Sequence, residues 1–196
     1  VTGLRFETAM GKFRQLLIAM ERIACWCASV VIPEGEGVKN TLIREKITAK
    51  PLQVVHNGNI NGVDLRYFDP EAVEAVEASE DFTYIFVGRI VRDKGISELV
   101  AAFDKVHAKH ADTRLILLGR LEPELDPIGA DTEAAIKSNS AIVAPGVVKD
   151  VRPWLKSADV LVHPSYREGF PNVVLQGGAM GLPCVVTDIN GSNEII

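Results

Sequence analysis

Two cationic side chains follow the first clear strand in the C-terminal part of the chain. The apolar run 82–88 is followed by Arg89, and Lys94 and Gly95 lead into a helix that we expect to begin near Ile96. Free N–H groups at a helix N-terminus favour an anion, and neighbouring cations add charge-assisted hydrogen bonds. The pattern is typical of a phosphate site at Gly88, Arg89 and Lys94, although two solvated surface cations would look the same.

A carboxylate and a small residue follow a later strand. The apolar run 160–163 leads into Glu168-Gly169-Phe170-Pro171. We expect a helix from about Pro171, because proline in the first helical turn loses no hydrogen bond. Gly169 permits a close backbone approach. Glu168 could accept hydrogen bonds from ligand hydroxyls, or it could only cap the helix.

Two familiar phosphate-binding fingerprints are absent from the sequence. No G-x-G-x-x-G motif links the first strand to its helix, and no G-K-[ST] loop occurs. The sequence therefore argues against a dinucleotide dehydrogenase and against a P-loop enzyme.

The composition is that of a folded, acidic chain. Of the 196 residues, 47% are hydrophobic and 24% charged, and the formal net charge is -5. This balance excludes extensive disorder and makes nucleic acid a poor partner, because no overall positive field would hold a polyanion. Cys25, Cys27 and Cys184 are too few and too scattered for a disulfide framework, so we expect buried, reduced thiols and no metal site.

The sequence contains no apolar run long enough for a membrane-spanning helix and no signal peptide pattern. We therefore expect a cytoplasmic protein. Because Val1 is not a natural start residue, we also expect a piece of a longer protein. The rest of that protein could carry a membrane anchor, or could contact the inner face of the membrane peripherally.

Strands and helices must alternate from residue 82 onward to position these side chains. The expected strands are 82–88, 114–119, 141–144, 160–163 and 184–187, and the expected helices are 96–109, 132–138, 151–157 and 172–180. Several strands are continuously apolar, as expected when helices cover both faces of a parallel sheet. The fold class is therefore α/β with a doubly wound, Rossmann-like parallel sheet, in which ligands bind at the carboxyl ends of the strands.

The N-terminal part is organised differently. Apolar residues at helical spacing over 4–24 predict a helix that buries one stripe: Phe13, Leu16, Leu17, Met20, Ile23 and Ala24. We expect strands at 29–33 and 52–56, a helix at 37–46 and an acidic helix at 71–79. The predicted domains are 1–56, the end of an N-terminal domain, and 71–196, a domain truncated at its C-terminal end. Turn dipeptides make 57–70 a linker.

The motifs occur together in an order that resembles one family, the retaining glycosyltransferases of glycosyltransferase family 4, which have the two-domain GT-B fold. The resemblance covers about residues 54–196, and 1–53 resemble the end of the acceptor domain less specifically. The matching segments are Asn61-Gly62-Val63-Asp64 with Phe68 and Pro70, Phe86-Val87-Gly88-Arg89 with Lys94-Gly95, Glu168-Gly169-Phe170-Pro171, Gly181-Leu182-Pro183, and Asn190-Gly191-Ser192-Asn193-Glu194.

The resemblance implies roles for these residues. Arg89 and Lys94 would neutralise the donor diphosphate in place of a divalent metal, so neither a metal nor another cofactor is expected. Glu168 corresponds to the first glutamate of the family's E-x7-E motif and would face the donor sugar, with the Gly169 and Phe170 backbone near the phosphates. The second motif position, which binds ribose hydroxyls in the family, is Gln176. An amide oxygen accepts hydrogen bonds without the charge-assisted strength of a carboxylate.

The implied function is hexosyl transfer, with retention, from a UDP- or GDP-sugar to a glycan or a lipid-linked acceptor. The resemblance is to bacterial capsule and surface-polysaccharide members, and the acceptor would be bound by the missing domain, so the 196 residues alone should be inactive. Two alternatives remain open: a non-catalytic nucleotide-sugar-binding module, in which Gln176 marks lost turnover, and a GT-B nucleotide-sugar epimerase.

Overall fold

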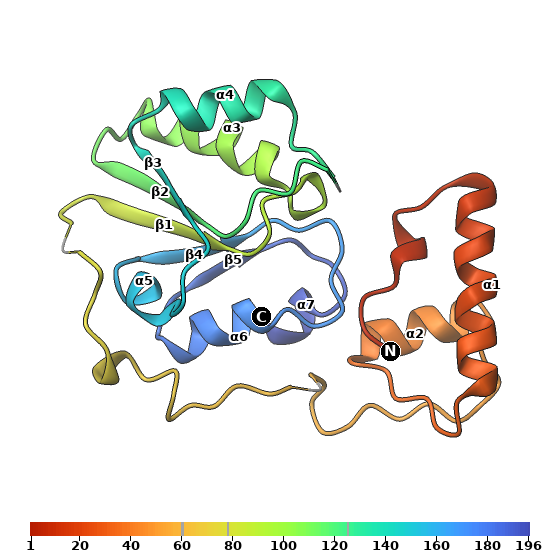
Figure 1. The fold of residues 1–196 in the computed structure, drawn as a ribbon. Coiled ribbons are helices and arrows are strands. Elements are labelled where there is room, and N and C mark those ends of the chain that lie inside the picture. Colours follow the sequence, from red (N-terminus) through yellow and green to blue (C-terminus); the bar gives the residue numbers. More distant parts are fainter. Residues whose placement is uncertain (60, 78, 125) are drawn as a thin grey trace. The chain divides into compact units, whose positions relative to one another are not determined.

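The chain forms two compact units in a computed structural model that describes residues 1–59, 61–77, 79–124 and 126–196 (Figure 1). The three-segment unit combines Val1–Gly62, Tyr166–Asn172 and Asp188–Ile196. The sheet unit combines Val63–Ser165 and Val173–Thr187. Each unit is thus built from segments that are separated in the sequence.

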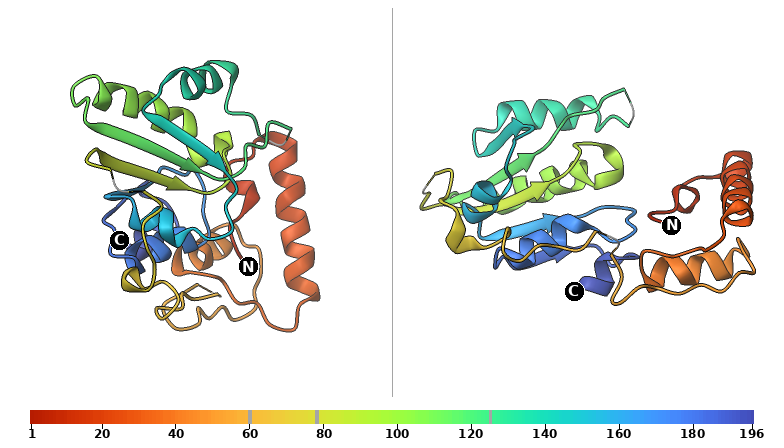
Figure 2. Two further views of the ribbon diagram at one scale, coloured as in Figure 1. Left: turned by 60° about the vertical axis from the view of Figure 1, so that its left-hand side comes forward. Right: turned by 60° about the horizontal axis from the view of Figure 1, so that its bottom comes forward.

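The sheet unit contains a five-stranded parallel sheet in the order β3-β2-β1-β4-β5. Helices α3 and α4 cover one face and α5 and α6 the other (Figures 1 and 2). The strands are β1 Phe82–Val87, β2 Thr113–Leu118, β3 Ile142–Gly146, β4 Val160–His163 and β5 Cys184–Val186. The helices are α3 Ile96–His107, α4 Ala130–Ser138, α5 Arg152–Lys156 and α6 Asn172–Ala179. The predicted doubly wound α/β fold is confirmed, and the predicted element boundaries differ by a few residues at most.

Apolar residues are buried on both faces of the sheet. Leu115, Ile116 and Leu117 of β2 are fully buried, as are Phe86 of β1 and Leu161 of β4. Consecutive strand residues point to opposite faces, so burial of three in a row requires cover on both sides. The uninterrupted apolar runs of the sequence are therefore explained by the helices on the two faces.

The three-segment unit has a smaller core around two helices, α1 Gly11–Cys27 and α2 Glu36–Arg44, with short turns η1 Arg5–Glu7 and α7 Ser192–Ile195. The buried residues that form its apolar cluster come from the first 47 positions: Leu4, Phe6, Ile18, Cys25, Val31, Val38, Leu42 and Ile47. No helix among the described residues is both long and apolar enough to cross a membrane.

The prediction for the first helix is wrong in its start and in its buried face. Residues 8–10 are not helical, and Gly11, with φ 58°, begins α1. The inward side chains are Ile18 and Cys25, seven positions apart and therefore on one face. Of the predicted stripe, Leu17 is partly buried against the core. Other members lie exposed, with Phe13 56%, Met20 56% and Ile23 62% accessible.

The two strands predicted in the N-terminal part are also wrong. Only a single parallel bridge, between Val31 and Leu52, forms there. The Lys50 ammonium group instead donates hydrogen bonds to carbonyl oxygens at the end of α1, those of Cys25, Trp26 and Ala28. The Lys50 side chain thus fixes this segment to the end of α1, where hydrogen bonds between two strands were expected. The predicted helix at 37–46 is confirmed as α2.

The acidic helix predicted at 71–79 is reduced to the turn η2 Pro70–Ala72, and Val73 has extended backbone angles. The reason is tertiary, because the Val76 N–H donates to the Pro153 carbonyl and to Ser157 Oγ. These bonds replace those that a helix would have made within itself. Residue 78 of the predicted helix lies outside the described residues.

The three cysteines are free thiols. Cys25 is buried and Cys184 is half-buried, and burial raises the pKa of both thiols. Cys27, in the last turn of α1, is exposed, so the prediction that all three are buried is wrong for this residue.

Candidate functional site

The loop after β1 has the geometry expected of a phosphate-binding turn in the sheet unit. Gly88 follows the strand with φ 153°, and the turn η3 Arg92–Lys94 leads to Gly95, whose φ of 70° is left-handed. Helix α3 begins directly afterwards, at Ile96. A Cβ at Gly95 would overlap the carbonyl oxygen of Pro164, in the loop after β4. The loops at the carboxyl ends of these two neighbouring strands therefore touch, and only glycine fits their contact.

Arg89 lies at this edge with an exposed side chain. Its Nη1 lies 3.2 Å from Oε2 of Glu122, and 53% of the Arg89 side chain is accessible. An exposed ion pair contributes at most about 1 kcal/mol, so a diphosphate with greater charge could replace the Glu122 carboxylate. Lys94 lies half-buried in η3.

Gln176 lies in the second turn of α6, as predicted, and is half-buried in the sheet unit. Helix α6 begins at Asn172, one residue after the predicted start at Pro171. Its contact with a ribose stays a prediction.

The Glu168 loop belongs to the three-segment unit, and close packing fixes its backbone. Gly169 is buried, and a Cβ on it would overlap Glu34 Oε2 and lie 2.5 Å from the Gly3 nitrogen. Burial raises the pKa of the Glu34 carboxyl, and the neighbouring Glu168 carboxylate adds to the rise. Phe170 is 8% accessible. Gly169 is therefore needed for contacts within the protein, whatever its part in ligand binding.

Glu168 lines a cavity of about 250 Å³ within the three-segment unit. The lining contains two carboxylates and two guanidinium groups, so their formal charges balance. The lining residues are Glu7, Thr8, Arg44, Tyr166, Arg167, Glu168, Ile189 and Asn190.

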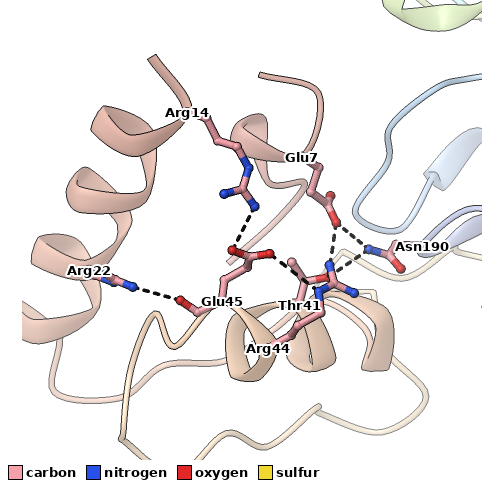
Figure 3. A network of polar contacts seen from close by, with 7 residues as sticks. All are labelled: Glu7, Arg14, Arg22, Thr41, Arg44, Glu45 and Asn190. Carbon is pink, nitrogen blue, oxygen red and sulfur yellow. Dashed lines mark hydrogen bonds and ion pairs between the residues drawn. The ribbon is translucent and has the colours of Figure 1, made fainter. Parts of the chain in front are cut away.

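Glu7 is held in this cavity by a network of polar contacts (Figure 3). Its Oε1 accepts hydrogen bonds from Thr41 Oγ1 at 3.2 Å and from Asn190 Nδ2 at 2.9 Å. Burial raises the pKa of the Glu7 carboxyl, while the Thr41 hydrogen bond and the positive charges of Arg44 and Arg167 act in the opposite direction.

Glu194 stabilises the N-terminus of α2. Its two carboxylate oxygens accept hydrogen bonds from the backbone N–H groups of Glu36 at 2.6 Å and Gly37 at 2.9 Å. Its Oε1 also accepts from the Gly191 N–H at 3.2 Å. An anion at this position satisfies unpaired donors and complements the helix dipole. Glu194 is thus a cap on a helix that is far away in the chain.

Glu7, Arg44 and Arg167 line the cavity but are not predicted from the sequence. Glu7 and Asn190 are 183 positions apart, and neither lies in a local motif that would pair them. Asn190 could have been found, because it begins one of the segments that carry the family resemblance.

A cluster of metal ligands is not evident in the ranges that the structure describes, where no three His, Cys, Asp or Glu side chains converge on one position.

Residues 81–196 match the family model described as glycosyl transferases group 1. The chain belongs to this family. Among similar proteins, the capsular polysaccharide biosynthesis glycosyltransferase CapM of Staphylococcus aureus is 30% identical over 100% of the chain and 53% of its own length. A UDP-Gal:α-D-GlcNAc-diphosphoundecaprenol α-1,3-galactosyltransferase of Escherichia coli is 27% identical over 100% of the chain and 52% of its own length. The chain therefore spans about half the length of these relatives.

Solved structures show the same fold. The Anabaena protein Alr3699/HepE, in complex with UDP and glucose, superimposes with a TM-score of 0.78 at 19% identity, over 93% of the chain and 51% of that protein. TarM of S. aureus, in complex with UDP and other ligands, gives a TM-score of 0.73 at 14% identity, over 98% of the chain and 37% of that protein. The predicted GT-B fold and the group 1 glycosyltransferase family are confirmed.

Proposed function

We propose that the chain carries the donor-binding part of a retaining hexosyltransferase that uses a UDP- or GDP-sugar. The observation that carries this proposal is the meeting of Arg89, Lys94 and the start of α3 at the carboxyl end of β1, in a chain of the group 1 family. Relatives named for capsular polysaccharide and for a UDP-galactose donor support the substrate class. The UDP complex of the Anabaena protein supports it as well.

The diphosphate leaving group gains negative charge as the glycosidic bond breaks. Arg89, Lys94 and the N-terminus of α3 would stabilise this charge more in the transition state than in the ground state. Fixed cations can do this without a metal or another cofactor. Glu168 would face the donor sugar, with the Gly169 and Phe170 amides near the phosphates and Gln176 near the ribose.

The acceptor, a glycan or a lipid-linked sugar, would be bound mainly by parts of the whole protein outside this chain. We therefore expect no transfer by the chain alone, because proximity requires both binding sites. Product formation from a UDP-sugar and a glycan acceptor by these residues would contradict this expectation. We place the reaction in the cytoplasm, at or near the inner face of the membrane, with no nucleic-acid partner.

Calorimetric titration with UDP, GDP, ADP and CDP in the presence of EDTA tests the nucleotide site. We expect weak binding of at least one nucleoside diphosphate without a divalent ion. Binding that requires added Mg²⁺ would show that Arg89 and Lys94 do not replace a metal.

The variant Arg89→Ala removes a charge-assisted contact worth roughly 1.5–3 kcal/mol and should weaken diphosphate binding about tenfold or more. Lys137→Ala is the matched control, because Lys137 lies in the last turn of α4, before the amino end of β3, and carries the same charge. Equal affinities of the wild type and a folded Arg89→Ala variant would show that Arg89 is a surface residue that does not contact the diphosphate.

The substitution at the second motif position favours a second candidate, a nucleotide-sugar-binding module without turnover. Gln176 lacks the charge that the family's glutamate offers to the ribose. Turnover by the full-length protein with a panel of donors distinguishes the two, because the module would bind a donor and transfer nothing.

A further inference from the structure

The cavity of the three-segment unit has a lining suited to a neutral, hydroxyl-rich ligand. Its carboxylates accept hydrogen bonds, its guanidinium groups donate, and the Asn190 amide can do both. Two negative and two positive groups leave no net charge that would select an ion. Tyr166, 55% accessible, adds an aromatic surface on which the C–H face of a sugar ring can pack.

The hydrogen bonds of Glu7 are distributed unequally between its two oxygens. Thr41 Oγ1 and Asn190 Nδ2 both donate to Oε1, and Oε2 takes part in neither bond (Figure 3). A glutamine at this position would serve the same two donors through its carbonyl oxygen.

The two hydrogen bonds of Glu7 therefore do not require its negative charge, which the positive charges of Arg44 and Arg167 partly balance. Burial makes the ionised carboxyl less favourable, as the raised pKa shows. A glutamine would avoid this cost but would also lose the attraction of Arg44 and Arg167. A carboxylate retained at the wall of a cavity, with one oxygen outside the network, is instead suited to accept a hydrogen bond from a ligand.

We propose that Glu7 is a specificity-determining residue whose Oε2 accepts a hydrogen bond from a hydroxyl group of a neutral sugar unit in this cavity. The proposal rests on the proposed function, because Glu168, the residue assigned to the donor sugar, lines the same cavity. The sugar unit is either that of the nucleotide donor or that of the acceptor. Both present the same hydroxyl chemistry to Glu7.

The variant Glu7→Gln separates the contacts of Oε1 within the protein from the proposed contact of Oε2 with a sugar hydroxyl. Its carbonyl can still accept from Thr41 and Asn190, whereas the position of Oε2 becomes an N–H donor. Thr41→Val is the matched control, because it removes one donor to Oε1 and leaves Oε2 intact. Thr41 is buried and does not line the cavity.

Two titrations distinguish the sources of the sugar. The first compares UDP with UDP-glucose and UDP-galactose, and GDP with GDP-mannose, by calorimetry. The second uses saturation-transfer NMR with the methyl α-glycosides of glucose, galactose and mannose, each with and without saturating nucleoside diphosphate.

We expect Glu7→Gln to leave nucleoside diphosphate affinity within about twofold. It should weaken sugar binding about tenfold or more in one arm, because one hydrogen bond to a charged group is lost. Loss in the sugar-nucleotide arm identifies the donor sugar, and loss in the methyl glycoside arm identifies the acceptor sugar. Thr41→Val should retain the affinity in both arms.

Unchanged sugar affinity of Glu7→Gln in both arms would overturn the proposal, as would an equal loss in Thr41→Val, which would show a structural role. Failure of the proposed function looks different, because the wild type would then bind no nucleoside diphosphate at all. The methyl glycoside titration without nucleotide would still test whether Glu7 binds a sugar in that case. Absence of any sugar binding by the wild type would overturn the assignment of Glu7 as well.

Discussion

The sheet unit and the three-segment unit are held together in different ways. In the sheet unit, strands and helices that follow one another in the chain pack through fully buried apolar side chains, among them Phe86, Leu117 and Leu161. In the three-segment unit, a smaller core is supplemented by polar bonds between segments far apart in the chain. Glu194 reaches Glu36 across 158 positions, for example.

The difference shows which forces determine each unit. Apolar burial is non-directional and tolerates small shifts, whereas a hydrogen bond requires a partner at a defined distance and angle. The sheet unit should therefore be sensitive to lost volume, and the three-segment unit to the loss of single polar groups. The two tryptophans, Trp26 in α1 and Trp154 in α5, provide one fluorescent reporter for each unit.

The largest expected effect is that of Leu117→Ala in β2. Leu117 is fully buried, so the cavity should lower the free energy of unfolding of the sheet unit by about 2–5 kcal/mol. Urea unfolding of a Trp26→Phe background, followed at Trp154, measures it. Leu65→Ala, at a position 70% accessible in the same unit, is the control and should change stability by under about 0.5 kcal/mol. Equal effects of the two substitutions would contradict a core-dominated sheet unit.

Removal of the Glu194 carboxylate should weaken the three-segment unit. Glu194→Ala leaves the Glu36 and Gly37 N–H groups at the start of α2 without their acceptor, at a cost of about 1.5–3 kcal/mol. Hydrogen exchange of the α2 amides should accelerate, while that of the β2 amides should not. Glu194→Gln, which keeps one carbonyl oxygen, should show a smaller change. Unaltered exchange in the alanine variant would show that the cap does not stabilise α2.

The substitution at Gln176 tests whether nucleotide binding uses the sheet unit. If Gln176 contacts the ribose, Gln176→Glu should tighten nucleotide binding by about 0.5–1.5 kcal/mol through a stronger acceptor. Titration of both proteins with the nucleotide and with its 2′,3′-dideoxy analogue measures this. Equal affinities in all four pairings would mean that residue 176 does not touch the ribose.

The smallest expected effects are opposite pH dependences in the two units. In the sheet unit, hydrogen bonds from Arg152 lower the pKa of Asp150. The stability that Asp150 contributes is therefore present above its unfolded pKa, about 3.9, and is lost as the pH falls through the lower folded pKa. Because the pair is partly exposed, the contribution should be under about 1 kcal/mol. A ¹³C carboxyl titration should show the Asp150 pKa return toward its ordinary value in Arg152→Ala.

Glu7 in the three-segment unit should behave in the opposite sense. Its folded pKa is raised by burial, so its favourable contribution is present below the unfolded pKa and is lost as the pH rises through the raised folded value. The stability difference between Glu7→Gln and the wild type, followed at Trp26 in a Trp154→Phe background, should therefore grow from pH 4 to pH 7 in favour of the glutamine. A constant difference would show that the Glu7 pKa is not raised by burial.

The sequence determined most of the sheet unit. Its strands, its helices and the positions of Arg89, Lys94 and Gln176 relative to them follow from local apolar periodicity, which reports burial directly. Parallel crossover connections then restrict the arrangement to a doubly wound sheet. The family resemblance came from motifs whose residues lie mostly within a few positions of one another.

The sequence also predicted α2 of the three-segment unit, but only the tertiary structure decided how the segments of that unit are held together. It left most of the predicted stripe of α1 exposed and brought Glu7, Arg44 and Asn190 to one cavity. In the sheet unit it reduced the helix expected from residue 71 to the turn η2, through the hydrogen bonds of Val76 to Pro153 and Ser157. Glu7 and Asn190 are 183 positions apart. Local periodicity records how far a side chain is buried but not which distant donor or acceptor it meets, because the direction of a polar bond is set only when the segments have come together.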